Sequence, residues 1–127
     1  MTAETTRATA ERLVALCRAH EAAKCLDELY RDDAVSVEAA LAPGMESVAT
    51  EGLAGIRGKH AWWEANFEVH KDETDGPYMH GEDRFGVIFS VDSTHKESGQ
   101  RSDMKELAVY HVDADGKIFR EEFFYTS

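Results

Sequence analysis

Two glutamates near the C-terminal end, Glu106 and Glu121, are the residues best suited to chemistry because apolar strand residues surround them. Residues 102–125 predict two strands joined by a turn at Val112–Gly116, where Asp bonds to nearby backbone and Gly accepts positive φ. Strand alternation gives each glutamate neighbours on its own face: Ala108 and Tyr110 beside Glu106; Phe119, Phe123 and Tyr125 beside Glu121. Carboxylates in such faces are costly unless they are paired, hydrogen-bonded or facing a cavity. The two either share a proton as an acid/base pair, or one is held by Arg120, Lys105 or a histidine, or both point outward into salt bridges.

Asp92 and His70 extend the set of catalytic candidates. Asp92 shares a strand face with Ile88, Ser90 and Thr94. If that face is concave, Asp92 joins the carboxylates; if it is convex, Asp92 belongs to a dimer interface. Histidine titrates near neutral pH, so His70 is expected either to carry protons or orient a ligand, or to cap a strand end. The sequence holds no HxxxH or HExxH pattern, and we expect no metal site.

Aromatic residues are numerous enough either to line a cavity or to fill a core. Trp63 lies on one stripe of an expected helix over 53–67, the stripe that should face a sheet. Tyr30 and Tyr110 could donate phenolic hydrogen bonds, and Phe89 and Phe123 could form apolar walls. These five residues are the candidate ligand contacts.

The elements that must position these residues segregate along the chain. The expected helices cover 4–19, 21–30 and 53–67, and the expected strands cover 35–39, 68–71, 84–96 and the final pair in 102–125. Ala42-Pro43-Gly44 begins a loop, Asp75-Gly76-Pro77 is a turn, and 78–83 is irregular. This order predicts an α+β domain over 1–127. Three helices in the N-terminal half pack on a strongly curved antiparallel sheet, forming a cone with an interior pocket.

Composition narrows the classes of partner. Lys and Arg number 14 against 25 Asp and Glu, a net charge of −11 that repels nucleic acid and anionic membrane. Cys17 and Cys25 form no CxxC or metal spacing and are expected as small buried hydrophobes in a reducing cytoplasm. The N-terminus lacks a signal pattern and no apolar run reaches a membrane span, so we expect a cytoplasmic protein.

Several segments resemble the NTF2-like superfamily, in particular its SnoaL-like members. The resemblance covers nearly the whole chain and rests on Leu29–Val35, Glu51–Gly58 and Asp115–Ile118 in that order. Residues 68–70, 98–101 and 120–125 resemble a bacterial SnoaL-like subgroup. The resemblance implies the cone fold. It does not imply one reaction, because the superfamily includes isomerases, cyclases, dehydratases, hydrolases and non-catalytic binders.

Ketosteroid isomerase, a member of that superfamily, gives a comparison by residue. Its general-base aspartate corresponds to Glu38, which adds Glu38 to the catalytic candidates; a structural glutamate is the alternative. Its two hydrogen-bond donors correspond to Leu13 and Ala108, which cannot donate, so its mechanism is not expected here. The same comparison implies that Glu106, Tyr110, Glu121, Phe123 and Tyr125 point into the cone.

Two functions from different classes remain open. The first is a protein that binds a hydrophobic or aromatic small molecule. If it is an enzyme, it performs cofactor-free isomerisation, cyclisation or dehydration, with proton transfer by Glu38, Glu106 and Glu121. The second is a non-catalytic ligand-binding or dimerisation module. In both, the apolar outer sheet face predicts a homodimer.

Overall fold

The computed structural model describes residues 3–41 and 46–125, so Ala42-Pro43-Gly44, where a loop was expected to begin, lies outside the described residues. The elements follow in the order α1 (Ala3–Arg18), α2 (Ala22–Leu29), β1 (Tyr30–Val37), β2 (Ala49–Glu51), α3 (Leu53–Asn66), β3 (Phe67–His80), β4 (Arg84–His95), β5 (Arg101–Val112) and β6 (Ile118–Phe124). The helices begin and end within one residue of the expected bounds.

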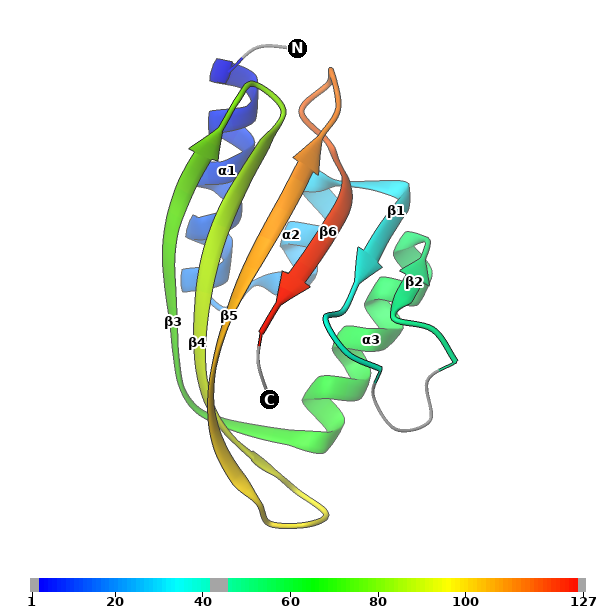
Figure 1. Cartoon of the computed structure of the whole chain (residues 1–127), viewed down its shortest axis with the longest axis vertical. Coiled ribbons are helices and arrows are strands. Elements are labelled where there is room, and N and C mark those ends of the chain that lie inside the picture. Colours follow the sequence, from blue (N-terminus) through cyan, green and yellow to red (C-terminus); the bar gives the residue numbers. More distant parts are fainter. Residues whose placement is uncertain (1–2, 42–45, 126–127) are drawn as a thin grey trace.

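The strands form one open sheet in the order β2-β1-β6-β5-β4-β3. Helices α1 and α2 lie behind this sheet, while α3 lies beside the end of β1 (Figure 1). The predicted α+β fold is confirmed. The sheet is mixed rather than purely antiparallel, because β1 pairs in parallel with β6. The long connection between these two strands permits the parallel pairing.

Strand β3 corrects two local expectations. It continues through Asp75-Gly76-Pro77, expected as a turn, and into residues 78–80, expected as irregular. β3 is an edge strand, where proline removes no hydrogen bond that a second neighbour would need. A register shift between Asp75 and Tyr78 absorbs the irregularity, and the Gly76–Pro77 peptide is cis. The edge position therefore allows β3 to continue through residues whose types favour a turn.

The final turn forms as predicted and is anchored to α1. The Asp113 carboxylate accepts hydrogen bonds from the backbone N–H groups of Asp115 and Lys117, each at 2.9 Å. Gly116 has φ of 80°, and its carbonyl accepts a hydrogen bond from the Thr9 hydroxyl at 2.7 Å. Glycine is required here, since a Cβ would combine an unfavourable φ with close contact to α1. The hairpin that carries Glu106 and Glu121 is thus fixed at its closed end.

The register of the hairpin decides which side chains face the helices. Tyr110 pairs with Glu121, and Ala108 pairs with Phe123, all on the inner face. Phe119 does not share that face: a register shift at His111–Val112 turns Ile118 inward and leaves Phe119 38% exposed. The expectation for Phe119 was wrong because alternation holds only between bulges. Leu13 and Ala108, the residues at the positions of the two missing donors, are both buried.

Candidate functional site

Side chains from three strands and one helix meet on the inner face, near the end of β1 and β6. Ser36 of β1 lies beside Glu121 of β6 in the parallel ladder, and Glu38 follows β1 on the same face. Lys59 reaches this point from α3. The structure therefore brings together the strand ends and the helix at the open side of the sheet.

Lys59 is the cation of this cluster. Its ammonium donates to the Ser36 hydroxyl at 2.6 Å and to Glu38 Oε1 at 2.5 Å. Glu38 also accepts a hydrogen bond from the Tyr125 hydroxyl at 3.3 Å. The Glu38 and Lys59 side chains are 20% and 22% exposed, which places their ion pair at the boundary between core and solvent.

Glu121 is the most deeply buried carboxylate of the cluster, at 2% exposure. The Tyr30 hydroxyl donates to Glu121 Oε2 at 3.1 Å, while Oε1 has no partner among the described residues. Burial raises the pKa of Glu121 to about 7, opposed by Lys59 and by the bond from Tyr30. Burial also raises the pKa of Tyr30 well above its ordinary value, so its phenol stays protonated and donates.

Glu106 is the carboxylate of the cluster that is both unpaired and partly open to solvent. Within 3–41 and 46–125 it forms no ion pair or side-chain hydrogen bond. Burial, and then the negative charge of Glu38, raise the pKa of Glu106 to about 7, and Lys59 opposes this rise. A carboxyl with such a pKa can both accept and donate a proton near neutrality.

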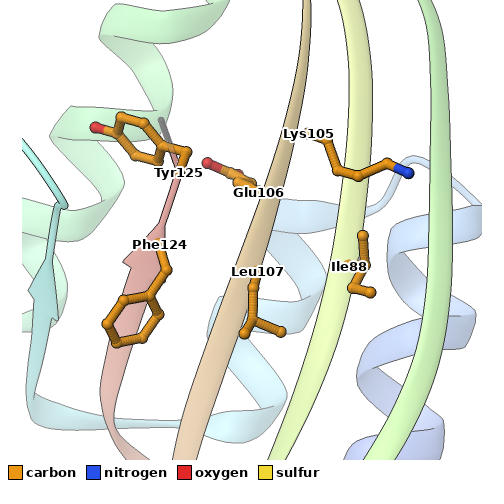
Figure 2. Close-up of a pocket in the computed structure, with 6 residues that line it drawn as sticks. All are labelled: Ile88, Lys105, Glu106, Leu107, Phe124 and Tyr125. Carbon is orange, nitrogen blue, oxygen red and sulfur yellow. The ribbon is translucent and has the colours of Figure 1, made fainter. Parts of the chain in front are cut away.

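A depression of about 410 Å³ opens beside Glu106, where β6 ends. Figure 2 shows Glu106 and Tyr125 on one side of β5 and β6, with Ile88, Leu107 and Phe124 forming an apolar wall on the other. The Lys105 side chain extends away from Glu106, across β4. The open space at this site thus lies at the rim of the sheet, and an enclosed interior pocket stays a prediction.

The expected aromatic contacts divide into core and rim. Tyr110 is buried and stacks on Phe85 at a centroid distance of 5.0 Å, and Tyr30 is buried beneath Glu121. Phe89 is partly buried against the core. Phe123 lies beneath Lys59, whose ammonium is 5.2 Å from the ring centroid.

Trp63, expected to face the sheet, is half-buried and stacks on Phe67 at 4.0 Å. Whether any of the five aromatic residues contacts a ligand stays a prediction.

Asp92 and His70 do not join this cluster. Asp92 shares the outer face with Ile88 and forms a two-bond ion pair with Arg101 at 2.7 and 2.9 Å. It lines a second, polar depression of about 580 Å³. His70 is exposed, with its Nε2 2.6 Å from the Thr94 hydroxyl. Asp92 therefore lies on the outer face, apart from the carboxylate cluster, and a dimer interface there stays a prediction. The catalytic expectation for Asp92 and His70 lacks a shared site.

Sequence reasoning passed over Ser36 and Lys59 and left Tyr125 out of the candidate site. Ser36 precedes Glu38 by two positions, so strand alternation puts both on one face. Lys59 follows Ile56, the buried residue of α3, by three positions, so both lie on the same side of the helix. These two spacings are the sequence signals that could have placed Ser36 and Lys59 near the site. The binding of a long lysine side chain to a strand end depends on tertiary packing.

Two general features complete the description. Among the described residues, no group of three or more His, Cys, Asp and Glu side chains is arranged to hold a metal ion. In the same part of the chain, no helix is both long and apolar enough to cross a membrane.

Comparison with known proteins relates the whole domain to one family. The family model of the SnoaL-like domain matches residues 4–125. A Mesorhizobium loti protein described as a candidate SnoaL-like polyketide cyclase is 34% identical, with a TM-score of 0.86 over 94% of this chain and 97% of that one. No curated protein matches the chain.

More distant structures share the fold. A candidate isomerase from Bacillus subtilis is 17% identical, with a TM-score of 0.75 over 99% of this chain and 90% of that one. A Mycobacterium tuberculosis protein in complex with estradiol-17β-hemisuccinate is 15% identical, with a TM-score of 0.69 over 99% of this chain and 95% of that one.

Proposed function

Since the chain belongs to the SnoaL-like domain family, we propose that it binds a hydrophobic small molecule and transfers a proton on it without a cofactor. The reaction is an isomerisation, cyclisation or dehydration, in which a proton leaves carbon next to a carbonyl group. The similar Mesorhizobium loti protein, described as a candidate polyketide cyclase, supports this class of chemistry. The bound steroid derivative of the more distant Mycobacterium tuberculosis protein supports a hydrophobic ligand.

The observation that carries the proposal is the state of Glu106. It has a pKa of about 7, it lacks an ion-pair partner in the described part of the chain, and it lines an open depression. A general base works best when its pKa lies close to the pH at which it operates. Glu121 has a similar pKa but is 2% exposed, so it is not able to touch a substrate as the site stands. Glu106 is therefore the proposed proton-transfer group, and Glu121 the buried charge behind it.

Donors near Glu106 supply the second half of the mechanism. Removing a proton next to a carbonyl leaves negative charge on the carbonyl oxygen, which nearby N–H or O–H donors stabilise. Lys59 and Tyr125 are such donors, and both are held by Glu38. In this mechanism Glu38 positions the donors. Its role as a base, implied by the family comparison, is the alternative assignment.

A non-catalytic binding module is the second candidate. The burial of Tyr30 and Tyr110 favours it, because these residues fill interior space that a substrate would need. The predicted homodimer also remains a proposal. It is supported by exposed Leu107 and Phe124 on the outer face, which line the same depression. A ligand and a second copy would compete for them.

Exchange of carbon-bound protons tests the catalytic function directly. Aryl ketones with exchangeable protons next to the carbonyl, such as tetralone, are incubated with the protein in deuterium oxide. The wild-type protein is expected to accelerate deuterium incorporation, measured by mass spectrometry. E106Q is expected to reduce that acceleration by about 10² to 10⁴, because the amide does not accept the proton.

D103N is the matched control, since Asp103 is exposed on the same strand and lies on the opposite face. Its exchange rate should equal that of the wild type. Incorporation at the buffer rate by the wild-type protein across the ketone panel would contradict the catalytic function and leave the binding module.

A further inference from the structure

The site holds more carboxylates than cations. Lys59 is occupied by Glu38 and Ser36. Glu106 has no ion pair in the described ranges, and Glu121 Oε1, buried in the same cluster, has no partner there either. A buried carboxylate without an ion pair is costly, and neither of these two forms one, although the charge of Lys59 lowers the pKa of both. A ligand that supplies a cation or a strong hydrogen-bond donor would therefore complement these carboxylates.

The lining of the depression indicates that such a ligand also has an apolar part. The apolar wall of Ile88, Leu107 and Phe124 leads along the sheet to Glu106 at the rim (Figure 2). Lys105, the cation in the lining, extends away from Glu106. A molecule lying in this space would place an apolar body on this outer-face wall and direct one polar end past the end of β6 to the carboxylate.

Aromatic rings in the cluster favour a positive polar end. The Phe123 ring already faces the Lys59 ammonium at 5.2 Å, a distance at which a ring attracts a cation. An anionic end would instead meet the Glu106 carboxylate at the depression, with the charge of Glu38 close behind it. The charges of the site therefore discriminate against carboxylate ligands and in favour of ammonium ligands.

We propose that the ligand of this site is a hydrophobic amine, in which an apolar or aromatic body carries a protonated nitrogen that pairs with Glu106. The inference rests on the binding part of the proposed function, because it names the ligand class of the same site. It goes beyond that function by assigning the charge of the ligand and the residue that recognises it. An ammonium paired with Glu106 occupies the proposed base, so such an amine binds without losing a proton to Glu106.

Proton linkage gives this pairing a measurable signature. The groups facing Glu106 come from α3, β5, β6 and the residues that follow β1 and β6: Glu38, Lys59, Tyr110, Glu121 and Tyr125. Burial and then the charge of Glu38, opposed by Lys59, leave the pKa of Glu106 at about 7 in the free protein. A bound ammonium lowers that pKa, so binding releases a proton and the affinity for the amine rises with pH across neutrality. A neutral donor produces a much smaller dependence.

Calorimetric titration of the full chain with three naphthalene probes of similar size tests the proposal. The probes are naphthylmethylamine, naphthylmethanol and naphthoate. The amine is expected to bind about tenfold or more tightly than the alcohol, and the naphthoate most weakly. The affinity for the amine is expected to rise between about pH 6 and pH 8, where the amine stays protonated, with proton release seen in buffers of different ionisation enthalpy.

Two variants assign the effect to one carboxylate. E106Q should abolish both the preference for the amine and its pH dependence, while D103N should keep both. If E106Q does not fold, the pH series on the wild-type protein still decides the question.

Three outcomes would overturn the amine proposal. If the alcohol binds as tightly as the amine, the ligand class is wrong while the proposed binding function stands. If the amine preference persists in E106Q, Glu106 is not the recognising residue. If no probe binds and no ketone is exchanged, the proposed function falls as well.

Discussion

Replacing Glu121 with glutamine is expected to raise the free energy of unfolding by about 2 kcal/mol at pH 8 and to change it little at pH 5. The pKa of Glu121 rises from 4.5 to about 7 on folding, mainly through burial. Each pKa unit corresponds to about 1.4 kcal/mol of stability that the ionised carboxylate loses on folding. Glutamine regains only part of this free energy, because its amide group needs hydrogen-bond partners of its own. Urea unfolding at the two pH values measures the effect.

The sign follows from proton binding in the two states. Between about pH 4.5 and 7 the folded protein keeps the Glu121 proton while the unfolded chain has lost it, so wild-type stability falls as pH rises. Below that window both states are protonated, and glutamine resembles the neutral acid. Above it, the wild-type protein has a buried charge that E121Q lacks.

Glu122 provides the matched control one residue away. It faces outward, and a hydrogen bond from His111, together with Arg120, lowers its pKa. E122Q is therefore expected to lower the stability slightly at pH 8 or leave it unchanged. If E121Q is less stable than the wild type at pH 8, the ionised Glu121 carboxylate stabilises the fold, and our view of it as an uncompensated charge is wrong.

Replacing Lys59 with methionine is expected to have the largest combined effect on stability and activity. Lys59 lowers the pKa of both Glu106 and Glu121, and its loss raises both. Breaking a buried ion pair costs about 3–5 kcal/mol, and partial exposure of the Lys59–Glu38 pair reduces this to about 2 kcal/mol at pH 8. Deuterium exchange should also fall by about 10² or more, because a donor to the developing oxyanion is lost.

Lys71 is the control for this substitution, since its exposed side chain lies on β3, outside the lining of the depression at Glu106, and pairs with Glu73. K71M should preserve both stability and exchange. Stability is read from urea unfolding and activity from the ketone assay. If K59M exchanges at the wild-type rate, Lys59 has no part in the chemistry.

The sequence predicted the fold and part of the site, and the limits have physical causes. Strand alternation grouped Glu106 with Ala108 and Tyr110, and Glu121 with Phe123, because the pleat fixes which residues share a side. The family comparison assigned that side to the interior, which the burial of Ala108, Tyr110 and Glu121 confirms. Alternation alone does not decide which face of the sheet the helices cover. The packing of α1 on β3 and β4 was therefore needed to show that Asp92 lies on the uncovered face.

Other features depend on long-range contacts that local patterns do not encode. The edge position of β3 allows the strand to pass through Pro77, which the sequence read as a turn. The grouping of Lys59 with Ser36 and Glu38 requires α3 to lie beside the end of β1. The burial of Tyr30 and Tyr110 depends on how deeply α1 and α2 pack behind the sheet.

The central claim is that Glu106 titrates near neutrality at the rim of the site. Carbon-detected NMR of labelled glutamate carboxyls measures this directly, with E106Q to assign the signal and E121Q to remove the coupling between the two acids. We expect a Glu106 midpoint at about 7 in both the wild type and E121Q. A midpoint near the ordinary value of 4.5 would contradict the account, because Glu106 would then be a fully ionised surface carboxylate at neutral pH.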